Sequence, residues 1–345
     1  MKKSLKILIV IVLVFALGAA GTFGYLYFSK DKPNDDAPET KNPETAEAVA
    51  FDRDDYVATV NGVSIVVDDI GVHVVNEADK TYKTVFDKPV SSAQFDGKTV
   101  YFKEIVTVDE NITFFINGEE VSADDYGPWK KAQIYSYSIE NDEVEELFNC
   151  NYEDSEFVVL NEGNIYYTDC DDDDVGNLDV RRSALCLYKY NVESKEKTKL
   201  LDAFAWNEIK GNKIFYQKNL IKKGIDYHEL YCFDLKTDTS KLITDEKANV
   251  VKIDDNAIYY LTCTYVTIDG VVTGKDHALK KTDLTSYTTQ TLTKLDFYEA
   301  GEYDLWADCV GDDVYFKFTS TAAEYDFDDY SYNLKTNTLT KLEKG

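Results

Sequence analysis

Arginine is nearly absent from this sequence: only Arg53, Arg181 and Arg182 occur among its 345 residues. Lysine and arginine together number 37 against 64 aspartates and glutamates, which leaves a formal net charge of −27. Nucleic-acid binding needs lysine and arginine to displace the counterions of the phosphates, so this charge argues against a nucleic-acid partner. It also argues against an anionic membrane surface as the ligand of the main domain.

Sequence motifs of common catalytic sites are missing too. The chain contains three histidines and has no lipase-type Gly-x-Ser-x-Gly, no phosphate-binding glycine-rich loop and no Cys-x-x-Cys pair. A zinc site or a general base would need other side chains that converge on one of the histidines. The motifs alone therefore give no positive evidence for an enzyme.

A long uncharged run is present at one place only, the amino terminus. Lys2, Lys3 and Lys6 precede an uncharged segment at residues 7–28. As a helix this segment would measure about 33 Å, close to the hydrocarbon thickness of a bilayer. The small residues in ALGAAG leave a cleaved signal peptide open, although the apolar run continues past them. The positive-inside rule predicts a cytoplasmic stub at 1–6, a single-pass signal anchor at 7–28 and the rest outside a bacterial cell membrane.

Residues 29–55 are polar and acidic, and they contain three of the five prolines. Such a segment cannot bury enough apolar surface to order itself. We therefore expect a flexible stalk between the anchor and the main domain.

From residue 56 onward the sequence repeats one pattern. Short β-branched and aromatic runs follow polar turns in GKTVYFK, GNIYYTD, GNKIFYQK, DNAIYYLT and DDVYFKF. A second pair of strands around a tight polar turn follows each run, as in LYCFDLKTDTSKL. Four strands per copy and six copies predict an all-β protein, a six-bladed β-propeller over residues 56–342, with seven blades as the alternative. The predicted blades are 56–87, 88–149, 150–201, 202–244, 245–294 and 295–342, and no strand exchange is expected to close the ring.

Two stretches resemble known propeller families. YYTD, at Tyr166 to Asp169, resembles the Tyr-Trp-Thr-Asp repeat of low-density-lipoprotein-receptor-type propellers, with Tyr167 at the tryptophan position. ELYCFDLKTDTSKLIT, at Glu229 to Thr244, is similar to blades of the Tol-system propeller and of bacterial surface propellers in a domain-of-unknown-function family. The resemblance implies a fold, with the aromatic pair packing between blades, and it carries no catalytic residue.

The repeat also indicates on which of the two faces of the propeller each connection between strands lies. If the strands of a blade are called a to d from the axis outward, the a–b and c–d turns are short. The b–c connections are long in five blades, at 103–132, 169–184, 217–227, 262–276 and 317–328, and tight only at 68–71. Long loops in a compact fold often carry function, so we expect a binding face there, with neutral drift as the alternative.

Aromatic and acidic side chains on these connections are the candidate binding residues. Asn117-Gly118 predicts an extra hairpin at 112–121, and Phe114, Phe115 and Trp129 are candidate aromatic anchors or blade-packing residues. The third connection supplies the acidic candidates Asp169, Asp171, Asp172, Asp173 and Asp174. Their spacing does not match a calcium loop, so we expect a solvated acidic loop and no cofactor, with Ca²⁺ as the alternative.

Histidines and cysteines complete the set of candidates. His228 and His277 occupy equivalent repeat positions near the long connections, where duplication alone or a shared ligand site would place them. Cys170 and Cys186 flank the third connection, and a disulfide between them would close about 15 residues. We expect free buried thiols, with this disulfide as the alternative.

Together these features predict a membrane-anchored, extracytoplasmic propeller that binds a cell-envelope protein, peptide or glycan through its b–c connections. A sensor that works with a membrane partner is a further hypothesis. The enzymatic alternative is a hydrolase or lyase acting on glycans or peptides at the mouth of the central channel.

Overall fold

The computed structural model describes residues 56–60, 62–109, 114–116, 119–121, 129–170, 185–222, 225–268, 271–295, 303–320 and 328–343. All of them belong to one compact unit, Thr45–Gly345. The predicted stub at 1–6, the signal anchor at 7–28 and the stalk at 29–55 lie outside the described residues. Within the segments that are described, no helix has the length and apolarity needed to cross a bilayer.

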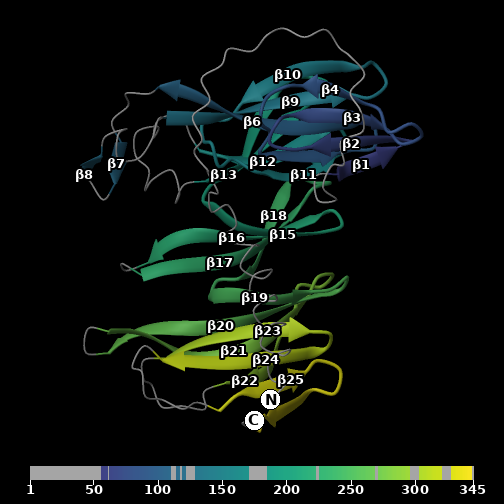
Figure 1. Cartoon of the computed structure of the whole chain (residues 1–345). Helices are drawn as coiled ribbons and strands as arrows, with labels where there is room; N and C mark the ends of the chain where they lie inside the picture. The colour runs from purple at the N-terminus through teal and green to yellow at the C-terminus, as the bar shows by residue number, and fades with distance from the viewer. Residues whose placement is uncertain are drawn as a thin grey trace, which may run out of the picture. The chain divides into compact units, whose positions relative to one another are not determined.

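The described residues form six antiparallel sheets of four strands, which can be followed by their labels in Figure 1. We number these sheets as blades 1 to 6 in chain order. Blades 1 to 3 consist of β1 (Tyr56–Val60), β2 (Val63–Val67), β3 (Val72–Asn76) and β4 (Tyr82–Phe86); β5 (Ser92–Phe95), β6 (Thr99–Asp109), β9 (Trp129–Ser138) and β10 (Glu143–Asn149); and β11 (Phe157–Asn161), β12 (Asn164–Asp169), β13 (Cys186–Asn191) and β14 (Lys197–Leu201). Blades 4 to 6 consist of β15 (Phe204–Lys210), β16 (Lys213–Lys222), β17 (Ile225–Asp234) and β18 (Thr239–Thr244); β19 (Lys247–Ile253), β20 (Ala257–Ile268), β21 (Val271–Asp283) and β22 (Thr289–Lys294); and β23 (Tyr303–Val310), β24 (Asp313–Ser320), β25 (Tyr330–Asn333) and β26 (Thr338–Lys341).

This topology confirms the predicted all-β, six-bladed propeller. Each blade is built from its own stretch of chain, and a two-stranded hairpin of β7 (Phe114–Ile116) and β8 (Glu119–Val121) is inserted between β6 and β9. Among the described strands none is exchanged between blades.

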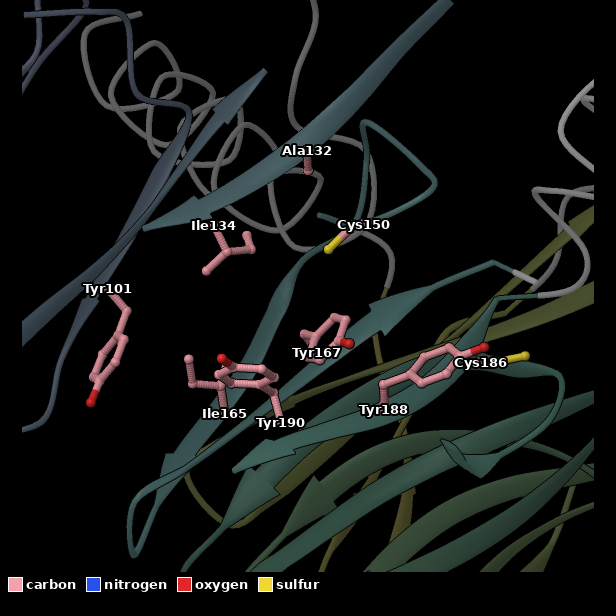
Figure 2. Close-up of a cluster of buried hydrophobic side chains, with 9 residues drawn as sticks. All are labelled: Tyr101, Ala132, Ile134, Cys150, Ile165, Tyr167, Cys186, Tyr188 and Tyr190. Atoms are coloured by element: carbon pink, nitrogen blue, oxygen red, sulfur yellow. The ribbon is translucent and has the colours of Figure 1, made fainter. Parts of the chain in front are cut away.

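Hydrophobic clusters join each blade to the next, and neighbouring aromatic residues on strand b serve two different junctions. Side chains alternate between the two faces of a strand. Tyr166 therefore packs toward blade 4, in a cluster with Phe204 and Phe233, while Tyr167 packs toward blade 2. Figure 2 shows the second cluster, in which Tyr167 lies with residues of both blades, including Ile134 and Tyr190. The aromatic pair of the repeat thus supplies the core between blades.

The a–b and c–d turns lie at one end of the sheets, which we call the turn edge. One lysine–carboxylate ion pair links consecutive blades at each of the five junctions: Lys83–Asp142, Lys195–Glu145, Lys189–Asp238, Lys210–Asp255 and Lys252–Asp312. Exposed pairs of this kind contribute up to about 1 kcal/mol each. They supplement the apolar clusters and do not replace them.

Candidate interaction edge

The end of the sheets opposite the turn edge carries the b–c connections. In blades 4 and 5 the structure corrects the predicted long loops at 217–227 and 262–276. Strands b and c instead continue as paired ribbons, up to Lys222 opposite Ile225 and up to Ile268 opposite Val271. The neighbouring strands a end earlier. The last residue of strand b that pairs with β15 is Lys218 in blade 4, and the last that pairs with β19 is Cys263 in blade 5.

A third ribbon extends from blade 2. There β6 and β9 remain paired as far as Asp109 opposite Trp129, whereas β5 ends opposite Lys103. We call these three two-stranded extensions the arms: residues 105–109 with 129–132, 219–222 with 225–228, and 264–268 with 271–275. The end of the sheets that bears them is the arm edge. Blade 1 has no arm, since the amide of Asp68 donates to the carbonyl of Gly71 and closes a tight turn.

The predicted extra hairpin is present in blade 2. Phe114 lies opposite Val121 and Phe115 opposite Glu120 in the β7–β8 ladder. Trp129 is the first residue of β9. The side chains of Phe114, Phe115 and Trp129 lie outside the described part of the structure, so the aromatic anchor stays a prediction.

Asp169 does not face solvent as a surface ligand would, because its side chain is completely buried. Its Oδ1 accepts hydrogen bonds from the amides of Asn151 (2.8 Å) and Cys170 (2.9 Å) and from the hydroxyl of Ser155 (3.3 Å). The ammonium of Lys197 donates to its Oδ2 at 3.1 Å. Burial raises the pKa of Asp169, and Lys197 opposes that rise. Asp169 therefore fixes the β10–β11 connection to blade 3.

A buried lysine holds the same connection from blade 2. The ammonium of Lys103 donates to the carbonyls of Ser155 (2.7 Å) and Glu153 (3.3 Å). Burial lowers the pKa of Lys103, and the nearby carboxylates of Glu156 and Asp154 oppose this change without reversing it. One cation and one anion, from strands b of adjacent blades, thus fasten the connection at residues 150–156. The sequence pattern did not single out Lys103, since a lysine in a strand is usually exposed.

The other acidic candidates, Asp171, Asp172, Asp173 and Asp174, lie outside the described residues, and a calcium site there stays a prediction. In the described part of the chain, no three His, Cys, Asp or Glu side chains form a group able to hold a metal ion. Cys170 and Cys186 are buried thiols, and the predicted disulfide between them is not formed. Cys186 lies opposite Asp169, and alternation turns the next residue, Cys170, to the other face.

A ligand site shared by His228 and His277 stays a prediction. His277 is buried in β21, and its carbonyl accepts from the amide of Leu295. His228 lies opposite Asn219 in the arm of blade 4, and its side chain is outside the description. The third histidine, His73, contacts Asp68 and Thr84, both at 3.0 Å. Burial alone would raise the pKa of Asp68, but hydrogen bonds from two backbone amides and His73 lower it.

Charge differs sharply between the blades. Residues 104–131 of blade 2 contain seven carboxylates and two lysines, and residues 169–174 of blade 3 contain five aspartates. The corresponding connections of blades 4 and 5 are nearly neutral: residues 219–228 contain Lys222, Lys223 and Asp226, and residues 264–275 contain Asp269 and Lys275. The arm edge therefore offers an acidic part beside a part rich in β-branched residues.

A prediction on stability concerns Tyr167, whose buried hydroxyl has no hydrogen-bond partner among the described residues. An unsatisfied buried hydroxyl costs free energy, so Tyr167→Phe is expected to raise the free energy of unfolding by about 1 kcal/mol. Tyr166 is the matched control, because its hydroxyl donates to Asp238 at 3.3 Å. Tyr166→Phe is expected to lower stability by about 1 kcal/mol. Urea unfolding of both variants checks the opposite signs, and a loss of stability in both would contradict the prediction.

The six four-stranded blades and their consecutive strand order define the chain as a β-propeller. No protein family matches the chain, and no curated protein matches it. Solved structures do resemble it at low identity. One is the tricorn protease, with 15% identity and a TM-score of 0.34; the match covers 83% of this chain and 26% of that one.

Two further solved structures resemble the chain at similarly low identity. The β-propeller domain of the Trilobed protease from Pyrococcus furiosus, described as having an open velcro topology, is 12% identical with a TM-score of 0.37. The match covers 82% of this chain and 79% of that chain. TolB from Acinetobacter baumannii is 11% identical with a TM-score of 0.32, over 82% of this chain and 64% of that chain.

Proposed function

We propose that the protein is a membrane-anchored, extracytoplasmic binding or scaffolding module. Its partner is a cell-envelope protein, peptide or glycan, which it binds through the arm edge. The resemblance of YYTD to receptor-type propellers and of residues 229–244 to bacterial surface propellers belongs to this proposal.

One observation carries the proposal: three blades extend strands b and c beyond their sheets on the same edge. Each arm exposes strand edges that are not paired with strands a and d of its own blade. Extended strands with unpaired edges can add a strand from a partner, and alternate side chains can then give specificity. The turn edge has no comparable extension among the described residues, since its connections are short turns.

The charge of the arm edge limits the kinds of partner that would fit it. The acidic segments of blades 2 and 3 favour a partner surface with basic or hydrogen-donating groups. The near-neutral arms of blades 4 and 5 favour backbone pairing. A basic extended peptide segment of an envelope protein combines both properties, and a hydroxyl-rich glycan would use the carboxylates alone.

Crosslinking in intact cells, followed by identification of the captured partner, tests the proposal. The variant shortens each arm and removes what lies beyond it, with an Asn-Gly turn that closes on the last retained pair: 107–130, 219–228 and 265–274. Asn-Gly suits a two-residue hairpin, so the sheets themselves are kept. We expect the natural protein to capture one partner that the variant loses.

Glu193→Gln, an exposed change in the β13–β14 turn at the turn edge, is the matched control and is expected to retain the partner. Equal capture by the natural protein and the arm variant would contradict a site on the arm edge. Release of modified glycan or peptide by the purified protein, without a captured partner, would favour the hydrolase or lyase.

A further inference from the structure

A pocket of about 360 Å³ lies on the turn edge, where blades 4 and 5 meet. Its size falls in the lower range of small-molecule sites. It lies at the other end of the sheets from the arms, so it is separate from the proposed binding edge. The lining residues come from both blades: Lys210, Gly211, Asn212, Lys213, Phe215, Asp234, Lys236, Asp255 and Leu284.

Two of the three lysines in this pocket have no carboxylate partner. Lys210 pairs with Asp255 at 3.2 Å. Lys213 donates instead to the backbone carbonyl of Leu284 at 3.2 Å, and its ammonium lies 5.9 Å from the centre of the Tyr287 ring. Neither Lys213 nor Lys236 forms an ion pair in the described structure. The pocket thus holds two positive charges that the protein itself leaves available.

The remaining carboxylate of the pocket has a structural role. Oδ1 of Asp234 accepts hydrogen bonds from the amides of Lys236 (2.9 Å) and Thr237 (3.3 Å) and so shapes the β17–β18 turn. These bonds also fix the backbone from which the Lys236 side chain extends. Three lysines against two carboxylates leave the lining with a net positive charge.

Blade 4 as a whole is close to neutral. Residues 202–244 contain seven lysines and six carboxylates, although the chain as a whole has a net charge of −27. Long-range repulsion from the acidic blades is screened beyond about 8 Å at physiological ionic strength. The charges that act on an anion at this pocket are therefore mainly those of its own lining, three lysines and two aspartates.

We infer that this pocket binds a small anionic ligand, whose carboxylate or phosphate group lies between Lys213 and Lys236. Lysine ammonium groups suit both anions, because they act as mobile point charges with three donors. Lys213 is partly held in place by the carbonyl of Leu284, so the cost of ordering it on binding is reduced. Leu284 and Phe215 also line the pocket, but both are buried in the apolar cluster that joins blades 4 and 5.

Calorimetric titration of the purified full-length protein at about 0.15 M salt tests the inference. The probes are benzoate, inorganic phosphate and the neutral benzamide. We expect saturable binding of benzoate or phosphate and none of benzamide. Benzoate alone would identify a carboxylate ligand, and phosphate alone would identify a phosphate ligand.

The variant Lys213→Gln with Lys236→Gln is expected to weaken binding of the anion by at least about tenfold, since each charged hydrogen bond contributes more than a neutral one. Lys195→Gln is the matched control, because this lysine lies on the same edge but pairs with Glu145. It should leave the affinity within about twofold. Absence of saturable anion binding, equal binding of benzamide, or equal weakening by both variants would overturn the inference. Urea unfolding confirms that each variant remains folded.

Discussion

Gly71→Ala is expected to lower the free energy of unfolding by at least about 3 kcal/mol, the upper end of the range for overpacking. A Cβ atom at this position would lie 1.9 Å from the carbonyl oxygen of Phe86. That oxygen belongs to the backbone at the end of β4, next to the pair Val72 and Phe86, so no side chain can rotate away. The backbone of the β2–β3 turn or of β4 must therefore move. Urea unfolding of the full-length protein measures the loss.

Gly163→Ala is the matched control for this change. Gly163 has a φ of +75°, but a Cβ there would meet no atom within 4 Å. Only the cost of a left-handed conformation applies, about 1–2 kcal/mol. Equal losses for the two variants would contradict the steric argument at Gly71.

Asp169→Ala is expected to destabilise the protein by about 3–5 kcal/mol, because each donor left unsatisfied in a buried site costs about 1–3 kcal/mol. The change leaves the amides of Asn151 and Cys170 and the hydroxyl of Ser155 without their acceptor. It also removes the carboxylate that forms an ion pair with the Lys197 ammonium. Because these groups fasten the connection between blades 2 and 3, hydrogen exchange at residues 150–156 should rise with the loss of stability.

Asp169→Asn separates the hydrogen bonds from the charge. Its amide oxygen can still accept from the two backbone amides, so its cost should be smaller than that of Asp169→Ala. Asp87→Ala, at an exposed carboxylate, should change stability by less than about 0.5 kcal/mol. A loss from Asp169→Ala no larger than that from Asp87→Ala would contradict the structural role.

The fold was predictable because its signal is local and repeated. Each copy contains a polar turn and a second hairpin, and five of the six contain an aromatic pair. The repetition makes the prediction stronger than any single copy would. The pair Tyr166 and Tyr167 shows why: two adjacent buried aromatics are typical of a strand covered on both faces. The sequence pattern predicts loops where the arms of blades 4 and 5 lie, although Asp269-Gly270 between apolar residues is the same hairpin signal that predicts β7–β8 from Asn117-Gly118.

The role of Asp169 was not predictable, because its partners are distant in sequence. The run from Asp169 to Asp174 suggests one solvated acidic loop, yet its first member is the last residue of β12 and points inward. Its partners Asn151 and Ser155 come from the β10–β11 connection, and Lys197 comes from β14. The pairing of Lys103 with two backbone carbonyls, and the pocket between blades 4 and 5, likewise arise only when blades pack.

The consecutive strand order has a consequence for synthesis of the chain. Each sheet is complete as soon as its own four strands have emerged, because none of the described strands waits for a partner from another blade. Domains generally fold as units from the amino terminus during synthesis, and local contacts form faster than distant ones. Each finished blade can then present an apolar face on which the next one assembles, so that folding can advance vectorially from blade 1 to blade 6.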